Sequence, residues 1–358
     1  MKKILIIQTA SIGDVILSTA LIETLHKVYP DAAIDLLVKK GNESLFQGHP
    51  FLHSVIVWDK RAGKYRGLFQ IMKLVRRNKY DLVVNIQRFF LTGLLTVLSG
   101  AGETRGFSKN PLSGCFTRSI QHDILPGVHE VFRNNALVAD LSIAVAPRPR
   151  LYPAASDEEA VQSYITNEFV TISPASLWFT KQYPVEKWAE LIRQISHETA
   201  VFLLGAPADN GLCEEIIRLS GHPGVKNLSG RLTLLQSAAL MKHARMNFTN
   251  DSAPMHLASA MNAPVTAIYC STVPSFGFGP LSDGPSSQKY RKNSLAVPAG
   301  YMATRHARKN ISGAPLIYVW SNLCRFPEPP CTVSISSAVK QFVLTFVRYC
   351  NIGAKNTS

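Results

Sequence analysis

The 358-residue sequence has no run of about 18 or more uncharged apolar residues, which is the length that a membrane-spanning helix needs. Its apolar start, Ile4–Ile7, ends at Gln8 with no small-residue cleavage site, so a first β-strand is favoured over a signal peptide. The six cysteines show no C-x-x-C spacing, which excludes the common zinc and thiol-redox motifs and predicts reduced thiols. A G-x-G-x-x-G dinucleotide fingerprint is also absent.

Acidic residues are nearly absent from the C-terminal part of the chain. Residues 285–358 contain ten Lys and Arg against one acid, Glu328, whereas residues 1–284 contain 28 basic and 23 acidic residues. A net charge of +14 would by itself suggest nucleic acid or an anionic membrane as a partner. Because most of the excess lies in this tail, the body is only mildly basic and we predict no nucleic-acid partner.

Apolar runs alternate with amphipathic segments through most of the chain. This alternation is typical of βαβ units with a mostly parallel sheet, so we predict an α/β fold with two Rossmann-like domains. The Pro-rich stretch 147–153 interrupts it and marks a boundary. We expect a first domain at 1–150, a second at 151–283 and an atypical basic tail at 284–358. The predicted strands are 4–7, 33–38, 55–57, 81–86, 169–172, 200–204, 246–249 and 265–269, and the predicted helices are 15–29, 67–78, 185–197, 209–220, 233–243 and 254–261.

The stretch Ser11-Ile12-Gly13-Asp14 lies directly after the first predicted strand and directly before a predicted helix. Gly13 allows a tight strand-to-helix turn, which places Asp14 beside the helix N-terminus at the carboxyl edge of the sheet. Ligands of such folds bind at this edge, so a carboxylate there has the position of a general base. The alternative is that Asp14 only caps the helix.

The second predicted domain has two strand-to-loop junctions with polar side chains. Ser176, Thr180 and Lys181 follow strand 169–172, and their hydroxyls and ammonium group are suited to holding a phosphate. Otherwise Lys181 is a solvated loop lysine. Asp209 follows strand 200–204, and it either caps the next helix or accepts hydrogen bonds from a ribose diol.

The sharpest signal is the run Asn250-Asp251-Ser252-Ala253-Pro254, with His256 close behind. We expect Asp251 or Ser252 to cap a helix whose first turn contains Pro254, so that its unpaired N–H groups face the cleft. A nucleotide-sugar pyrophosphate fits such a helix end. His256 either contacts the phosphate or is a structural histidine.

In this order and spacing, the motifs resemble the glycosyltransferase family that includes the ADP-heptose:lipopolysaccharide heptosyltransferases. The resemblance extends from Met1 to about Asp283 and implies a GT-B fold, in which an acceptor domain and a donor domain face a central cleft. It implies inverting, metal-independent transfer of a heptose or similar sugar from a nucleotide donor such as ADP-heptose to a lipopolysaccharide core acceptor, without a cofactor. Its most specific pieces are Ser11-x-Gly13-Asp14, Lys181-x-Tyr183-Pro184 with Trp188, Ser229-Gly230 before Leu234, and Asn250-Asp251-Ser252 with His256-Leu257-Ala258.

By similarity, Asp14 is the base that takes the proton from the acceptor hydroxyl. Lys181 and Thr180 match positions that hold donor phosphate, and Asp209 matches an acidic position that contacts the ribose. The loop and helix start at 251–256 match the region that faces the sugar-phosphate end of the donor. The residues implied in substrate or donor binding are Ser11, Gly13, Ser176, Thr180, Lys181, Asp209, Asp251, Ser252 and His256.

Two positions depart from the family pattern: Ala253 stands where relatives usually have glycine, and Gln8-Thr9-Ala10 replaces an arginine-containing run. The second departure bears on the identity of the acceptor more than on the fold. A catalytically silent relative that binds only nucleotide or a partner is the alternative function. A lipid-linked acceptor further implies a cytoplasmic enzyme, peripheral to the inner membrane of a Gram-negative bacterium. The basic segment Leu68–Lys79 is either a docking face for that membrane or simply an amphipathic helix on the sheet.

The tail at 284–358 does not follow the family pattern, because a Cys-rich segment that many relatives carry is missing in this frame. When the third base of each codon is combined with the first two of the next, permitted codons between Leu295 and Ala314 spell such a segment. We therefore hypothesise that the tail is translated out of frame and poorly ordered, which the gene's nucleotide sequence tests. The competing hypothesis is a genuine membrane-binding tail with an apolar helix at Val339–Tyr349.

Overall fold

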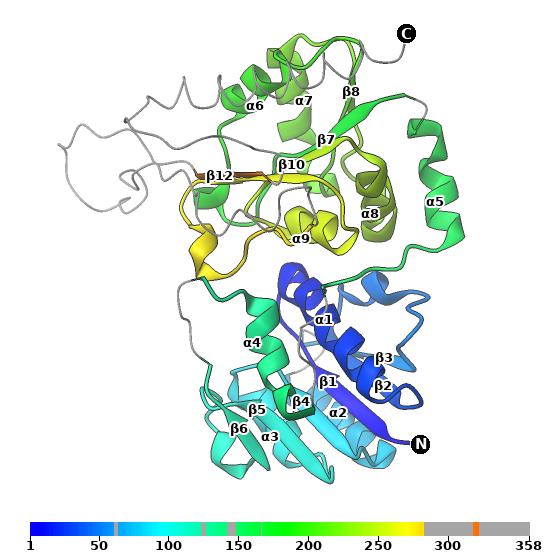
Figure 1. Ribbon diagram of the computed structural model, residues 1–358, viewed down its shortest axis with the longest axis vertical. Helices are drawn as coiled ribbons and strands as arrows, with labels where there is room; N and C mark the ends of the chain where they lie inside the picture. Colours follow the sequence, from blue (N-terminus) through cyan, green and yellow to red (C-terminus); the bar gives the residue numbers. More distant parts are fainter. Residues whose placement is uncertain (61–63, 123–126, 142–147, 166, 283–317, 322–358) are drawn as a thin grey trace, which may run out of the picture. The chain divides into compact units, whose positions relative to one another are not determined.

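The computed structural model describes the chain except for residues 61–63, 123–126, 142–147, 166, 283–317 and 322–358. The chain divides into two compact units (Figure 1). Of the described residues, unit 1 contains Met1–Asp157 and Ser275–Phe278, and unit 2 contains Glu158–Pro274 and those from Gly279 onward. Each unit is an α/β structure built on its own six-stranded sheet.

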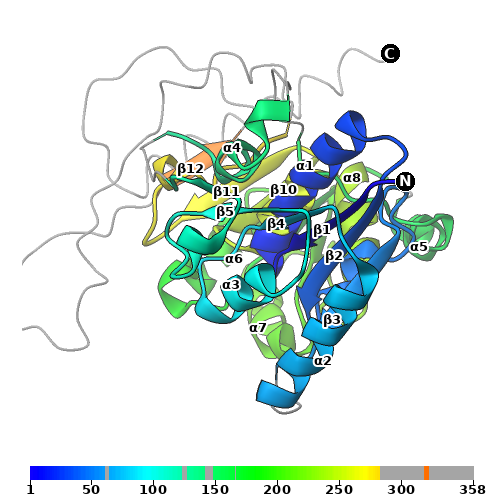
Figure 2. The same ribbon diagram turned by 90° about the horizontal axis from the view of Figure 1, so that it is seen from below.

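Unit 1 has the strand order β3-β2-β1-β4-β5-β6 with every neighbouring pair parallel. This is the 3-2-1-4-5-6 order of a Rossmann fold. Helices α2 and α3 cover one face of the sheet, and α1 and α4 cover the other (Figure 2). The elements are β1 (Lys3–Ile7), α1 (Ile12–Val28), β2 (Ala33–Lys39), β3 (Ser54–Trp58), α2 (Lys64–Asn78), β4 (Leu82–Asn85), α3 (Phe90–Val97), β5 (Glu103–Phe107), β6 (Arg118–Ile120) and α4 (Glu130–Ala136).

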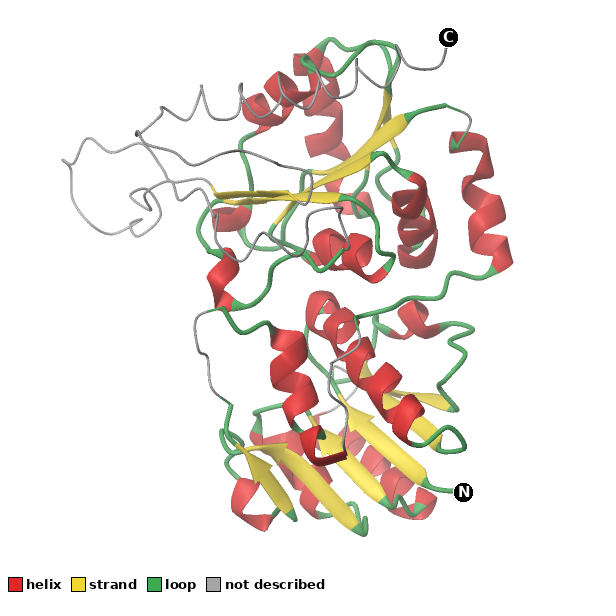
Figure 3. Ribbon diagram, viewed as in Figure 1, coloured by secondary structure: helices red, strands yellow, loops and turns green. Residues whose placement is uncertain are grey.

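Unit 2 repeats the same order as β9-β8-β7-β10-β11-β12, with β12 antiparallel to β11 and the other pairs parallel. Trp188 and Phe248 are among the large side chains buried in its core. The elements, coloured by type in Figure 3, are α5 (Ala155–Val161), β7 (Phe169–Ser173), α6 (Val185–Ile192), β8 (Ala200–Leu203), α7 (Asn210–Ser220), β9 (Val225–Asn227), α8 (Leu234–His243), β10 (Met246–Asn250), α9 (Ala253–Ala260), β11 (Val265–Tyr269) and β12 (Tyr318–Ser321).

The division between the units falls after Asp157, beyond the Pro-rich stretch that marked the sequence-based boundary. The reason is that this stretch bonds to α1 of unit 1. The backbone N–H of Arg150 donates to Thr19 Oγ1 at 2.9 Å, and the Tyr152 hydroxyl donates to Glu23 Oε1 at 2.6 Å. These bonds hold residues 150–152 on the first unit.

A second segment, Ser275–Phe278, lies after β11 in sequence but packs in unit 1. The Ser275 carbonyl accepts from the Gly127 N–H at 3.0 Å, and the Gly277 carbonyl accepts from the Glu130 N–H at 2.8 Å. The buried Arg133 donates to the Phe276 carbonyl at 3.0 Å. The chain therefore returns to the first unit after β11, within the range assigned from sequence to the second domain.

Among the described residues, no helix is both long and apolar enough to cross a membrane. The cysteines of this part, Cys115, Cys213 and Cys270, are free. Apart from 318–321, the tail from residue 284 onward lies outside the described residues, as does the apolar helix expected at Val339–Tyr349. Within the tail, Tyr318–Ser321 form β12, which pairs with β11.

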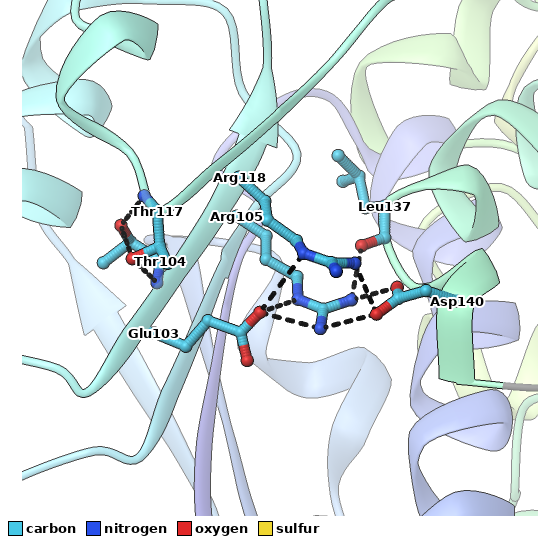
Figure 4. Close-up of polar contacts among 7 residues, drawn as sticks. All are labelled: Glu103, Thr104, Arg105, Thr117, Arg118, Leu137 and Asp140. Atoms are coloured by element: carbon cyan, nitrogen blue, oxygen red, sulfur yellow. Dashed lines mark hydrogen bonds and ion pairs between the residues drawn. The ribbon is translucent and has the colours of Figure 1, made fainter.

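A buried arginine holds the β5–β6 edge of unit 1 together (Figure 4). The Arg105 side chain is 4% exposed and lies between the carboxylates of Glu103 and Asp140, at 2.7 and 2.5 Å. It also donates to the Leu137 carbonyl at 3.2 Å, and Arg118 adds a second cation 2.5 Å from Asp140. Burial raises the pKa of Asp140, but the hydrogen bond and charge of Arg105 outweigh it and lower the pKa.

We expect the double variant Glu103→Gln/Asp140→Asn to lower the free energy of unfolding by about 2–3 kcal/mol, because it leaves the Arg105 charge buried without a counter-ion. A lowered folded pKa means that Asp140 stabilises the protein above the unfolded pKa of about 3.9, and that this contribution is lost as the pH falls through the folded pKa. Urea unfolding at neutral and acidic pH measures both effects. Glu215→Gln, which removes the exposed pair with Arg218, is the control and should leave the stability nearly unchanged, because solvent screens an exposed ion pair.

Candidate functional site

The switch point of the unit 1 sheet lies between β1 and β4, where the strand order reverses direction. Open α/β sheets bind ligands beyond the carboxyl ends of the strands at this point. Gln8 and Gln87 follow these two strands, and Gln87 Nε2 donates to Gln8 Oε1 across the gap. Gln8 also donates to the Asp14 carbonyl at 3.5 Å, so the buried glutamine pair is linked to the start of α1.

Asp14 lies in the first turn of α1, three residues after the N-cap position, which Ser11 occupies. Asp14 therefore does not occupy the N-cap position that the capping alternative gave it. The Ser11 hydroxyl donates to Asp14 Oδ2 at 2.5 Å, which holds the carboxylate near the helix start, and the Asp14 side chain is half-buried. Gly13 forms part of the same turn. A carboxylate in this position is suited to accepting a proton from a hydroxyl group.

Two further side chains tie the loop between β1 and α1 to neighbouring strands. Lys60 follows β3 in the sequence, and its ammonium group donates to Thr9 Oγ1 at 3.0 Å. Asn42 follows β2, and its Nδ2 donates to the Ala10 carbonyl at 3.1 Å. Burial, and then the charge of Lys39, lower the pKa of Lys60. Lys60, Asn42 and Gln87 could not be assigned to this site from the sequence, because only the strand order brings their loops beside Asp14.

The switch point of the unit 2 sheet lies between β7 and β10, and the predicted residues Lys181 and Asp251 meet there. Lys181 follows β7 and Asp251 follows β10, and Lys181 Nζ lies 2.6 Å from Asp251 Oδ2. Thr272, after β11, donates to the same oxygen at 2.6 Å. The Asp251 side chain is 6% exposed and that of Lys181 is 26% exposed. The carboxylate is thus buried, whereas the side chain of the lysine that it pairs with is partly exposed.

The buried Asn250 fixes the two loops that carry this pair. Its Oδ1 accepts from the Tyr183 N–H at 3.0 Å, and its Nδ2 donates to the Pro174 carbonyl at 2.6 Å. Gln182 Nε2 donates to the Ser176 carbonyl at 2.8 Å within the same loop. Asn250 therefore positions the residues on either side of Lys181.

The other residues predicted near the donor phosphate surround this pair in sequence. Ser252 occupies the N-cap position of α9, without a side-chain capping bond, and the helix has Pro254 in its first turn. Thr180 and Lys181 belong to one short 3₁₀ turn, Phe179–Lys181. His256 is only 5% exposed, which favours the structural role over direct phosphate contact.

Asp209 follows β8, and it caps a local turn. Its Oδ2 accepts from the Ala206 N–H at 2.7 Å, within the 3₁₀ turn Pro207–Asp209, whereas its side chain makes no capping bond to the next helix, α7. The motif residue Gly230 lies against this turn: its N–H donates to the Gly205 carbonyl at 2.9 Å, and its φ is +70°. A Cβ at Gly230 would lie 2.9 Å from Pro207 Cα. The Ser229-Gly230 motif thus shapes the loop that carries Asp209.

We expect Gly230→Ala to lower the free energy of unfolding by about 1–3 kcal/mol, because a left-handed φ and a backbone clash oppose the added methyl group. Gly211→Ala is the matched control, since a Cβ at Gly211, in helix α7, would meet nothing within 4 Å. It should be neutral or stabilising. Thermal unfolding of the two variants measures the difference, and equal stability would contradict the packing at Gly230.

Within the described ranges, no group of three or more His, Cys, Asp or Glu side chains is arranged to hold a metal ion. The two carboxyl-edge sites offer instead a half-buried carboxylate in unit 1 and a lysine over a buried carboxylate in unit 2. The first can accept a proton. The second can bind an anion.

Two Rossmann-like units of this kind are the architecture of a GT-B glycosyltransferase, and solved structures agree. The structure of the Escherichia coli ADP-heptose lipopolysaccharide heptosyltransferase II superposes with a TM-score of 0.67 at 24% identity, covering 79% of this chain and 88% of that one. The Escherichia coli heptosyltransferase WaaC with ADP superposes with a TM-score of 0.65 at 21% identity, covering 77% and 90%. The predicted fold class is confirmed.

The family model of glycosyltransferase family 9 (heptosyltransferase) matches residues 68–298, more than half of the chain. The chain belongs to this family and is a glycosyltransferase. Lipopolysaccharide heptosyltransferase 3 of Escherichia coli is 27% identical over 275 residues, which are 73% of this chain and 81% of that protein. The family match continues beyond Asp283, where the resemblance was expected to end, although residues 284–298 lie outside the described residues.

Proposed function

We propose that the protein transfers a heptose from a nucleotide donor such as ADP-heptose to a lipopolysaccharide core acceptor. The family membership and the names of the relatives support this donor and acceptor class. A lipid-linked acceptor would place the enzyme in the cytoplasm, at the inner face of the inner membrane of a Gram-negative bacterium.

In the proposed reaction, Asp14 removes the proton from the attacking acceptor hydroxyl. The hydroxyl oxygen then forms a bond to the anomeric carbon while the bond to the donor diphosphate breaks. A single displacement of this kind inverts the anomeric centre and needs one carboxylate, unlike a double displacement with a pair of them. Ser11 keeps the Asp14 carboxylate at the start of α1 during this step.

The observation that carries the proposal is the Lys181–Asp251–Thr272 cluster at the switch point of unit 2. The departing nucleoside diphosphate gains negative charge, and a lysine at the carboxyl edge beside the start of α9 can stabilise it. We propose that Lys181 and the α9 N-terminus bind the diphosphate in place of a metal ion. Thr180, Ser176 and Ser252 would add hydroxyl donors, and Asp209 would accept from the ribose.

The test is a transfer assay with purified protein, ADP-heptose and a heptose-deficient core acceptor, with and without EDTA. We expect a product heavier by one heptose, with inverted anomeric configuration by NMR, at an unchanged rate in EDTA. Retention of the anomeric configuration in the product would contradict the single displacement. Loss of activity in EDTA, with recovery on adding Mg²⁺, would contradict the proposal that Lys181 takes the place of a metal ion. Donor binding without any transfer would support the silent-relative alternative.

A further inference from the structure

Helix α2 presents a basic and apolar outer face on unit 1. Its inner stripe, Leu68, Ile71 and Val75, is buried against the sheet. The outward residues recur three and four positions apart along the helix, so they form one continuous arc. Phe69 is 62% and Leu74 38% exposed, and no acidic residue occurs between Lys64 and Asn78. The exposed residues of the arc are Phe69, Gln70, Lys73, Leu74, Arg76 and Arg77.

Helix α3 extends this face with apolar residues. It packs beside α2 on the same side of the sheet and carries no charged side chain (Figure 2). Phe89 and Phe90 at its start are 65% and 52% exposed. Val97 further along the helix is only partly buried. Exposed apolar side chains that gather in one patch and are rimmed by charged residues are typical of a protein or membrane contact surface.

We propose that the outer face of α2, together with the start of α3, docks on an anionic lipid bilayer. Lys73, Arg76 and Arg77 would contact acidic headgroups, while Phe69 and Leu74 enter the boundary between headgroups and acyl chains. A soluble polyanion would match the cations but would leave the two apolar side chains in water. The inference rests on the proposed function in that a lipid-linked acceptor gives the membrane contact its purpose.

The test compares three variants of the full chain in vesicle co-sedimentation. The vesicles contain equimolar phosphatidylglycerol and phosphatidylethanolamine, or phosphatidylcholine alone. The first variant is Lys73→Gln/Arg76→Gln/Arg77→Gln and the second is Phe69→Ser/Leu74→Ser. The third, Lys27→Gln/Lys226→Gln/Arg231→Gln, removes the same charge from exposed residues elsewhere and serves as the matched control.

We expect the α2 charge variant to bind the anionic vesicles about a hundredfold more weakly than the unmodified protein at low salt, since each cation near such a surface contributes roughly a factor of five. The apolar variant should lose about tenfold, also at high salt, where charge is screened. The control should lose far less. None of the three should change transfer to a lipid-free acceptor.

Equal losses in the α2 charge variant and the control would overturn the proposal, because net charge alone would then explain binding. Unchanged binding by Phe69→Ser/Leu74→Ser, with full competition by heparin, would show a general polyanion site and would also overturn it. If neither the unmodified protein nor any of the three variants transfers sugar, the proposed function is wrong. The vesicle comparison still decides the docking surface in that case.

Discussion

Replacing Asp14 by asparagine is expected to lower kcat for sugar transfer by about 10²–10⁴-fold, because the amide cannot take the acceptor proton. Asn retains an oxygen that can accept the Ser11 hydroxyl bond, so the start of α1 should keep its conformation. Asp14 also lies in unit 1, whereas the proposed diphosphate site lies in unit 2. Steady-state kinetics at saturating donor and acceptor measure the loss.

Asp31→Asn is the matched control for this prediction, since Asp31 is an exposed acid in the same unit and outside the switch point. It should leave kcat within twofold, a change of less than about 0.5 kcal/mol in the barrier. Transfer by Asp14→Asn at the rate of the unmodified protein would remove Asp14 from the reaction. A similar loss in both variants would point to general destabilisation.

Replacing Lys181 by methionine is expected to raise the donor Kd by about 10- to 100-fold, because a charge-assisted hydrogen bond to the diphosphate is lost. The change also leaves the buried Asp251 carboxylate with the Thr272 hydroxyl but without its cation. A loss of stability is therefore expected as well, and it must be separated from the loss of binding. Titration of ADP measures affinity, and thermal unfolding measures stability.

The double variant Lys181→Met/Asp251→Asn separates the two effects. If Lys181 only neutralises Asp251, the double variant regains both stability and ADP affinity. If Lys181 binds the diphosphate, stability recovers while affinity stays low, which is the outcome we expect. Lys187→Met, which breaks an ion pair with Glu190 in the same unit, is the control and should leave ADP affinity unchanged.

Most strands and helices of both units follow from the hydrophobic pattern, because long apolar runs leave few alternatives. Strand β5 does not, since Glu103 and Arg105 interrupt its apolar character. The buried Arg105 is neutralised by Glu103 in the same strand and by Asp140, which is distant in the sequence. The pattern of β5 alone contains no sign of that partner. Strand β6 is three residues long and helices α3 and α4 are short, so they too escaped prediction.

The candidate site, too, could be predicted from the sequence only in part. The chemical types of Asp14, Lys181 and Asp251 and their places at strand ends were evident from sequence, but their partners were not. Lys181 and Asp251 are 70 residues apart, and Thr272 is 21 residues further. Their contact depends on β7, β10 and β11 being neighbours, which is a property of the strand order. The sequence pattern therefore indicates which residue types lie at the strand ends, and the strand order of the sheet determines which of them are in contact.

We propose that unit 1 supplies the catalytic base and that unit 2 supplies the binding site for the donor diphosphate. The most direct test measures ADP-heptose binding by calorimetry and sugar transfer by mass spectrometry on the same preparations of Asp14→Asn and Lys181→Met. We predict that Asp14→Asn binds the donor as the unmodified protein does but transfers the sugar about 10²–10⁴-fold more slowly, and that Lys181→Met binds the donor weakly. Undiminished transfer by Asp14→Asn, or full donor affinity in Lys181→Met, would contradict the account.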